Sequence, residues 1–396
     1  MKSRIKFILL FIILVVIIFF VLLKIDFIKL GIGNLFKTKN IINVEKSSST
    51  KVNGNSFSFT FSQKVAFPKN TRTASIIVDS SNNYEIFTQD GKKFKKTYSS
   101  QISLPSNFSL EKHGGIKSVF VIEDIYFALI TLKTPECHYL SLTRLNDLKE
   151  LLKSECLPDV SNIDFNGSGG AYLYNKDEIL LSIGVPEIIS ESIRQLAQDL
   201  NSIFGKIISI KKYDLLNTNN NIVNYEIFSY GHRNSQGLSF LNKYVFSSEH
   251  GPYGGDEINL LKKDNNYGWP IISYGTRYYN GKSFNFYHNN KKIVEPIYTF
   301  LPSVAPSALA KCPKNLINYY NKKNCLMSLT LREKSILIIL LDDNFRVISV
   351  EKFFLDKRLR HFGLKKNSEI YFDKDNNFYF SVDNEGVYKG SFSDFR

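Results

Sequence analysis

Short apolar segments separated by turn residues recur from Ser56 onward, and this pattern restricts the fold more than any other feature of the chain. The segments are rich in β-branched and aromatic residues, and several are typical of two strands joined by a tight turn. They are FSFTF, ASIIVD, YEIFTQDGKKFKKTY, SVFVIEDIYFALITL, AYLYNKDEILLSIG, KYVFSSEHG, SILIILLDDNFRVISVEKFFL and EIYFDKDNNFYFSVDNEGVYKG. The repetition predicts an all-β fold built of similar successive sheets, as a propeller requires.

The segment from Pro186 to Phe204 departs from this pattern, because its apolar residues have helical spacing. We expect a helical insertion between two sheets here. With 396 residues, of which 43% are apolar, the chain is long enough for one large domain, which we place at residues 56–396.

The N-terminus combines positive charge with a long apolar run. Lys2, Arg4 and Lys6 precede an unbroken apolar stretch at residues 7–23. This pattern predicts a transmembrane signal-anchor at residues 1–28, with the rest of the chain on the periplasmic side of the inner (cytoplasmic) membrane. A cleaved signal peptide is the alternative, although no small-x-small cleavage site precedes Gly31. Residues 29–55 are polar and rich in Lys, Asn and Ser, and we expect a flexible tether.

The net charge of +14 predicts affinity for anionic surfaces. The 51 Lys and Arg residues are spread along the chain, so we expect a membrane surface as the partner and no nucleic acid. A general bias of the sequence toward basic residues, without a role in binding, explains the net charge equally well.

The four cysteines form two pairs that are close in sequence. An even number of cysteines in a domain predicted to lie outside the cytoplasm favours disulfides. Pairing by proximity gives Cys137–Cys156 and Cys312–Cys325, one of three possible connectivities. A metal site is disfavoured because no CxxC spacing occurs.

The stretch from Ser229 to Pro270 concentrates polar residues between short apolar runs and contains the only tryptophan, Trp269. In the turn after Ser229, Arg233 can bind a carboxylate through two parallel hydrogen bonds. A loop with three glycines and one proline follows, and such loops let backbone carbonyls approach a ligand or a cation. The alternative is a polar turn cluster that only supports a β-rich scaffold.

Three motifs in this stretch, GHRNSQGLSF, SEHGPYGGDEINLL and NNYGWPIISYG, follow one another over about 45 residues. Together they resemble the signature of the soluble quinoprotein glucose dehydrogenases, also called aldose sugar or glucose/sorbosone dehydrogenases. The resemblance extends from about residue 166 to residue 388. It implies a six-bladed β-propeller that holds pyrroloquinoline quinone (PQQ) and calcium and oxidises the anomeric hydroxyl of a sugar.

The resemblance also implies roles for individual residues. Arg233 and Asn234 match positions that contact PQQ, and the carbonyls of Gly251 and Pro252 match the calcium ligands. His250 and Asp256 match residues that flank the calcium loop. Arg358 and Arg360 match the Arg-x-Arg pair that clamps PQQ carboxylates, and PSVAPSALA at residues 302–310 matches a segment that shapes the pocket rim.

The chain departs from the family pattern at the general base. The family has a histidine in the context His-x-x-Gly-Arg-Leu, and Asn166 stands at that position in NGSGGA. A neutral amide cannot accept the proton of the sugar hydroxyl, and the loss of a positioned base typically costs 10² to 10⁴ in rate. Asp164 is the nearby carboxylate that could substitute.

Three further positions have changed. His113 replaces a glutamine, Arg332 replaces the pocket lysine, and His361 follows the Arg-x-Arg pair where an aspartate is usual. We still expect PQQ contacts from His113, His250 and Arg332, and a metal contact from Asp256.

Two functions follow from these matches and departures. The first is a membrane-anchored periplasmic PQQ-dependent sugar dehydrogenase that passes electrons to a respiratory acceptor. The second is a non-catalytic propeller that serves as a carbohydrate-binding or scaffold protein. Fold alone cannot decide between them.

Overall fold

The computed structural model describes residues 48–95, 98–158, 163–186, 190–217, 222–284, 292–321 and 324–394. The chain divides into two compact units, Met1–Ile41 and Ile42–Arg396, and all described residues belong to the second unit. The predicted anchor at residues 1–28 therefore lies outside the described residues. No helix within the described ranges is long and apolar enough to cross a membrane.

The described strands form six mainly antiparallel units, in which most strands are consecutive and joined by hairpins. The first unit contains β3 (Thr73–Val78), β4 (Tyr84–Thr88), β5 (Lys92–Lys95) and β6 (Tyr98–Gln101). The second contains β7 (Ile116–Ile122), β8 (Ile125–Lys133), β9 (Cys137–Arg144) and β10 (Lys149–Lys153), with β11 (Leu157–Pro158) beside β9. The third contains β12 (Gly169–Asn175), β13 (Glu178–Ile183), β14 (Lys206–Lys211) and β15 (Glu226–Tyr230), with β19 (Asn265–Asn266) beside β15.

The fourth and fifth units are β16 (Ser235–Leu241), β17 (Tyr244–Glu249), β18 (Asp256–Leu261) and β20 (Tyr298–Phe300), and β21 (Pro306–Lys311), β22 (Cys325–Thr330), β23 (Ser335–Leu341) and β24 (Val347–Phe354). The sixth contains strands from both ends of the described chain, namely β25 (Leu359–Lys365), β26 (Phe378–Val382), β27 (Gly386–Asp394), β2 (Phe57–Ala66) and β1 (Thr50–Asn53). Pairing of β2 with β27 joins the two ends.

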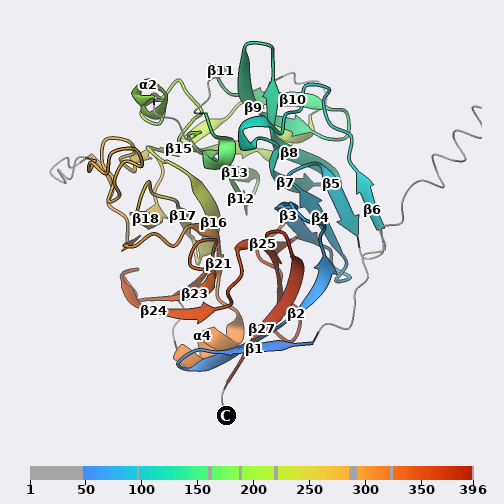
Figure 1. Ribbon diagram of the computed structural model, residues 1–396, viewed down its shortest axis with the longest axis vertical. Helices are drawn as coiled ribbons and strands as arrows, with labels where there is room; N and C mark the ends of the chain where they lie inside the picture. Colours follow the sequence, from blue (N-terminus) through green and yellow to red (C-terminus); the bar gives the residue numbers. More distant parts are fainter. Residues whose placement is uncertain are drawn as a thin grey trace, which may run out of the picture. The chain divides into compact units, whose positions relative to one another are not determined.

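The first strands of the six units surround a common centre (Figure 1). β3, β7, β12, β16, β21 and β25 contact one another in this order, and β25 pairs with β3 in parallel to complete the circle. Side-chain packing holds most neighbouring units together, and no hydrogen-bonded sheet closes on itself among the described strands. The all-β fold is therefore confirmed, and its arrangement is propeller-like.

Buried aromatic residues fill the space between the last unit and its neighbours. Phe59 and Phe380 are fully buried, and the ring centroids of Phe59 and Phe378 lie 5.7 Å apart. Burial of one such ring contributes about 1.5–3 kcal/mol relative to leaving it exposed. The strands carry these rings because FSFTF and NFYFSV alternate between two faces.

The helices of the described residues are short: η1 (Glu111–His113), η2 (Phe165–Gly167), α2 (Glu191–Gln195), α3 (Lys212–Leu216) and α4 (Lys314–Tyr320). Among the described residues of the helical insertion expected at residues 186–204, only α2 is helical. Beyond α2, Lys206 Nζ donates hydrogen bonds to the carbonyls of Leu196 and Ala197. These carbonyls belong to turns and not to a continuing helix.

The tether predicted for residues 29–55 also ends earlier than expected. Its last residues include β1, whose Val52 lies opposite Phe59 of β2 and packs against the aromatic core. Pairing with a long strand of the sixth unit makes this polar segment a strand, although its composition is typical of a linker.

Both cysteine pairs predicted by proximity are confirmed. Cys137–Cys156 ties the start of β9 to the segment before β11, and Cys312–Cys325 joins the residue after β21 to the first residue of β22. The Cα atoms of the two pairs lie 5.6 and 5.4 Å apart.

Candidate functional site

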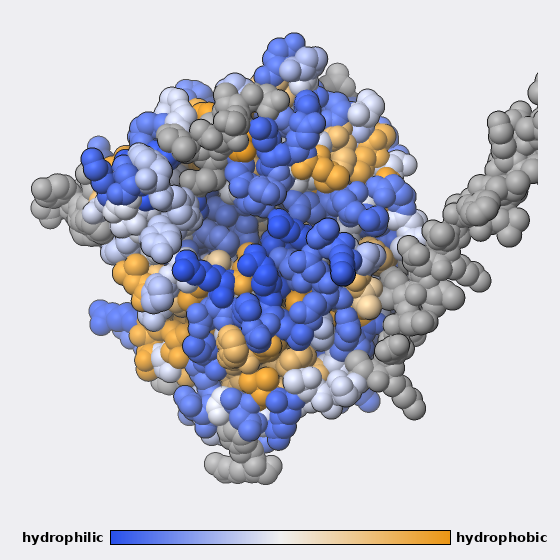
Figure 2. Space-filling model, in the orientation of Figure 1, coloured by the Kyte–Doolittle hydropathy of each residue, from blue (hydrophilic) through white to orange (hydrophobic). Residues whose placement is uncertain are grey.

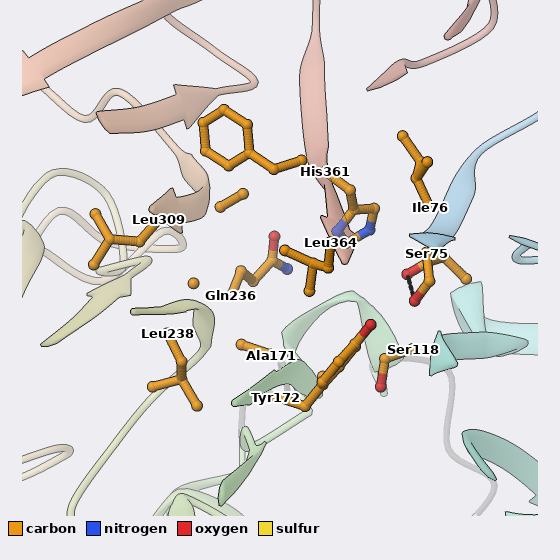
Figure 3. Close-up of a pocket in the computed structure, with 15 residues that line it drawn as sticks. Ser75, Ile76, Ser118, Ala171, Tyr172, Gln236, Leu238, Leu309, His361 and Leu364 are labelled. Carbon is orange, nitrogen blue, oxygen red and sulfur yellow. Dashed lines mark hydrogen bonds between the residues drawn. The ribbon is translucent and has the colours of Figure 1, made fainter. Parts of the chain in front are cut away.

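Polar residues gather where the inner strands begin. They line a cavity of about 40 Å³, which we call the mouth cavity, and its polar side chains include Arg72, Lys117, Asn166, Gln236, Arg360 and His361. A second cavity of about 50 Å³, the apolar cavity, shares Gln236 and His361 with it. Figure 3 shows Leu238 and Leu309 on one side of the apolar cavity and Ser75 and Ser118 on the other. Each cavity has room for a few water molecules.

Charged and polar side chains also dominate the surface in the middle of the face shown in Figure 2, whereas apolar residues gather in patches nearer its edge. A propeller-like fold brings the loops at the strand ends toward its centre. Residues that are far apart in sequence therefore meet there.

The turn with Arg233 and Asn234 is fixed from behind by Glu249, which ends β17. Glu249 Oε1 accepts hydrogen bonds from the backbone N–H groups of Arg233 and Asn234, and its Oε2 lies 2.9 Å from His232 Nδ1. His232 Nε2 lies 2.8 Å from Ser229 Oγ. The whole network is buried, so the turn is held rigidly. Its members are Ser229, His232, Arg233, Asn234 and Glu249.

Arg233 presents its guanidinium beside aromatic rings. Its Cζ lies 5.4 Å from the ring centroid of Trp269 and 5.9 Å from that of Tyr278, distances at which cations are attracted to ring faces. Its Nη1 donates to the carbonyl of His250 at 3.1 Å. The predicted contact residues Arg233 and His250 are thus brought together.

Asn234 connects this turn to the loop that carries the changed base position. Its Oδ1 accepts a hydrogen bond of 3.0 Å from Gly169 N, and its Nδ2 lies 3.5 Å from the carbonyl of Asn166. The sequence motifs at 166 and 234 therefore form one site. The side chain of Asn166 is exposed beside Arg72, whose Nη1 lies 3.4 Å from its Oδ1.

Asp164, proposed above as a substitute base, is held by its neighbours. It accepts hydrogen bonds from Asn166 N at 2.8 Å and Asn166 Nδ2 at 3.3 Å. Its Oδ1 also lies 3.1 Å from His113 Nδ1. His113, Asp164 and Asn166 thus lie together, and the carboxylate orders the loop.

The loop after His250 offers two backbone oxygens. In the described part of the chain, the carbonyls of Gly251 and Pro252 accept no hydrogen bond, so both are available to a cation such as calcium. Gly251 is tightly enclosed, because a Cβ there would lie 2.2 Å from the carbonyl oxygen of Gly255.

Asp256 connects two loops through hydrogen bonds of its carboxylate. Its Oδ1 accepts a hydrogen bond from Gly251 N at 2.9 Å, and its Oδ2 accepts from the backbone of Val304 and Ala305 and from Ser303 Oγ. The buried carboxylate joins the calcium-type loop to PSVAPS. No group of three or more His, Cys, Asp or Glu side chains within the described ranges could hold a metal.

The Arg-x-Arg pair divides into two different environments. Arg360 forms two hydrogen bonds of 2.6 Å with the carboxylate of Asp383, whereas Arg358 is exposed and lies 3.8 Å from it. Arg332 is exposed, and its Cζ lies 5.9 Å from the ring centroid of Tyr253. Of the three, Arg358 has the guanidinium best placed to receive a further carboxylate.

Burial and positive charge shift the pKa of several groups. Burial lowers the pKa of His361 to about 3, with a further contribution from Arg360. Burial lowers the pKa of His250 as well, and Arg233 and Arg360 add to this effect against the carboxylate of Asp256. Both imidazoles are neutral at pH 7 and lie among cations, so the site favours an anionic ligand.

Five residues that position or charge the site were not singled out from the sequence. Asp383 belongs to a DNEG turn and Glu249 ends an apolar strand, so both resemble ordinary scaffold residues. An acidic residue directly before the HGP motif was the one signal for Glu249. The others are His232, Arg72 and Lys117.

Residues 132–378 match the family model described as Glucose / Sorbosone dehydrogenase. The uncharacterized protein slr1608 of Synechocystis is 30% identical over 213 residues, which cover 51% of each chain. The aldose sugar dehydrogenase YliI of Escherichia coli is 27% identical over 210 residues, 50% of this chain and 53% of the relative. The matched sequence thus spans about half the length of these curated relatives.

Solved structures show the same fold over a larger part of the chain. The apo-form of the soluble aldose sugar dehydrogenase from Escherichia coli has a TM-score of 0.65 at 20% identity and covers 84% of this chain and 99% of its own. The PQQ-bound aldose sugar dehydrogenase from Streptomyces coelicolor has a TM-score of 0.60 at 16% identity, with 85% and 98% covered. The family match includes more than half of the residues, and the chain belongs to the glucose/sorbosone dehydrogenase family.

Proposed function

We propose that the protein is a PQQ-dependent sugar dehydrogenase that oxidises the anomeric hydroxyl of an aldose on a six-bladed propeller. One observation carries the proposal: the rigid Arg233–Asn234 turn lies beside two backbone carbonyls, those of Gly251 and Pro252, that accept no hydrogen bond from the described residues. Family membership and the fold it shares with a PQQ-bound relative support the same function.

The residues present fit a tricarboxylated quinone. The site contains Arg233, Arg358 and Arg72 on different elements, and the carboxylate of Asp383 offsets the charge of Arg360. Guanidinium groups bind carboxylates through paired hydrogen bonds. When bound, PQQ would accept the hydride from the sugar.

Calcium would be held by the carbonyls of Gly251 and Pro252. Two carbonyls are fewer than the six to eight oxygens that calcium prefers, so the quinone and water would supply the rest. Calcium binding is therefore expected to depend on the quinone.

The protein's own groups bind and orient the reactants. Glu249 and His232 fix Arg233 and Asn234, and Asp256 fixes the loop of Gly251 and Pro252. Asn166 at the family's base position can donate or accept a hydrogen bond but cannot take up the hydroxyl proton.

A direct test uses the full-length protein with PQQ, calcium and a panel of aldoses, with reduction of an artificial electron acceptor as the readout. We expect oxidation of at least one aldose that depends on both PQQ and calcium. Absence of turnover with every aldose, although PQQ binds, would contradict the catalytic function.

Asn166 favours a second function, a non-catalytic carbohydrate-binding or scaffold protein. The substitution Asn166→His separates the two. If the wild-type protein binds PQQ but is inactive and the variant is active, the natural protein is a disarmed member of the family.

The basic, apolar N-terminus supports a location at the inner membrane with the propeller in the periplasm, where a respiratory acceptor would receive the electrons. Fusion of alkaline phosphatase to the C-terminus tests this topology. Active phosphatase is expected, and an inactive fusion would contradict it.

A further inference from the structure

Lys117 of β7 lines the mouth cavity together with Asn166 and Gln236, although no family motif includes it. Its Nζ donates hydrogen bonds to the carbonyl of His113 at 2.7 Å and to the carbonyl of Gly114 at 3.1 Å. The side chain thus turns back toward η1, and the residue forms part of the cavity wall.

The neighbouring strand leaves room for this side chain at Gly170. A Cβ at Gly170 would lie 3.0 Å from Cβ of Lys117 and 3.2 Å from its carbonyl oxygen. The glycine also has a φ of +103°, which a residue with a side chain rarely adopts. The family motif has an arginine at this position. In this chain the basic side chain at the mouth cavity therefore comes from Lys117 of β7 and not from residue 170 of β12.

The surroundings of Lys117 disfavour its charged form. Burial is the main cause, and the guanidinium groups of Arg360 and Arg72 act in the same direction, whereas the carboxylate of Asp164 opposes them. Together these groups lower the pKa of Lys117 to about 7. His361, the other titratable group that lines the cavity, is neutral at this pH and adds no charge.

The hydrogen bonds of Lys117 Nζ suit both protonation states, and in the neutral state they leave a lone pair. The amine has two N–H groups and one lone pair, and the two carbonyls of His113 and Gly114 account for both N–H groups. The lone pair is left for a proton. In contrast, the carboxylate of Asp164 accepts two hydrogen bonds from Asn166.

We propose that Lys117 Nζ, in place of the family's histidine, takes up the proton of the substrate hydroxyl through a water molecule in the mouth cavity. The proton would convert the amine to an ammonium group. The carbon that bears the hydroxyl would lose a hydride, with its electron pair, to the bound quinone. This inference rests on the proposed function.

The test compares Lys117→Met with Lys117→Arg in the full-length protein. Methionine removes the base and arginine keeps a charge that cannot be lost near pH 7. We expect both variants to lower kcat by about 10² to 10⁴ and to lose the rise of kcat/KM around pH 7, while both bind PQQ within a few-fold of wild type. An added primary amine such as methylamine should restore part of the activity of Lys117→Ala.

A measurement without cofactor checks the same lysine. Acetylation of the apo protein at a series of pH values, read by mass spectrometry, should show Lys117 reacting with a midpoint near pH 7, with exposed Lys69 as the reference in the same sample. Equal pH dependence at both lysines would overturn the inference. Thermal denaturation of each variant verifies that it folds.

The possible failures are distinct. If wild type oxidises sugar and Lys117→Met does so at the same rate with the same pH profile, Lys117 is not the base, but the proposed function stands. If Lys117→Met loses PQQ affinity and Lys117→Arg regains full activity, the lysine is an anion anchor and the inference is wrong. If wild type does not bind PQQ, the proposed function and the inference both fail.

Discussion

Arg360 and Asp383 form a bidentate ion pair in which Arg360 Nε and Nη2 each lie 2.6 Å from one carboxylate oxygen. The backbone N–H of Asp383 also donates to the carbonyl of Arg358 at 3.0 Å. Because Asp383 is buried, its negative charge depends on the guanidinium of Arg360. The pair therefore holds the start of β25 in place and commits one of the two arginines of the Arg-x-Arg motif to structure.

Asp383→Asn should destabilise the protein by about 3 kcal/mol, because it leaves a largely buried guanidinium without its counter-charge. The urea midpoint of unfolding measures the loss. Asp356→Asn is the matched control, since Asp356 pairs with Lys334 on the surface and its loss should leave the midpoint unchanged. Equal urea midpoints for the two variants would show that the buried ion pair stabilises the fold no more than the surface ion pair does.

Glu249→Gln should weaken PQQ binding at least tenfold and destabilise the fold by about 2 kcal/mol. The charged oxygens order the turn of Arg233 and Asn234 and contact His232, and an amide supplies one acceptor in place of two. Equilibrium titration with PQQ and chemical denaturation measure the two effects. Ser229→Ala removes only the outer hydrogen bond of His232 and should have the smaller effect on PQQ.

Gly251→Ala should abolish calcium-dependent stabilisation, because the added Cβ would lie 2.2 Å from Gly255 O and displace the carbonyls next to it. The melting temperature with and without calcium, in the presence of PQQ, gives the readout. Gly281→Asn is a suitable control, since nothing lies within 4 Å of a Cβ there and asparagine tolerates positive φ. A calcium response retained by Gly251→Ala would exclude this loop as the cation site.

Acid should destabilise the fold partly through His361. Its pKa is lowered to about 3 by burial and by Arg360, against an ordinary value near 6.5. Between these values the unfolded chain binds more protons, so the free energy of unfolding falls as the pH drops from 6.5 to 3. In His361→Asn the guanidinium chloride midpoint should fall less between pH 7 and pH 4 than in wild type. The same decrease of the midpoint in both proteins would show that His361 does not contribute to destabilisation by acid.

Local sequence predicted those features that depend on few neighbours. The strands around FSFTF and SVFVIEDIYFALITL follow from alternation and turn residues, and the cysteine pairs follow from proximity. The motif residues 166, 233 and 234 do meet in space, although they belong to two different units.

The remaining features depend on contacts between distant segments. Nothing in the sequence near Asp383 indicates that it neutralises Arg360, and nothing near Lys117 indicates that Gly170 of another strand makes room for it. β1 became a strand because β2 offered a free edge. In the helical insertion expected at residues 186–204, Lys206 binds the carbonyls of the residues that follow α2, and the described chain forms turns there.

Binding of PQQ tests the quinone site most directly. Full-length protein is titrated with PQQ in the presence and absence of calcium, and both the quinone absorbance and the melting temperature are followed, since a ligand of the folded state must raise its stability. We expect saturable, calcium-dependent binding in wild type and at least tenfold weaker binding in Arg233→Met, with Arg346→Met as an exposed-loop control. Binding that is absent, or that Arg233→Met leaves unchanged, would contradict a quinone site at this turn.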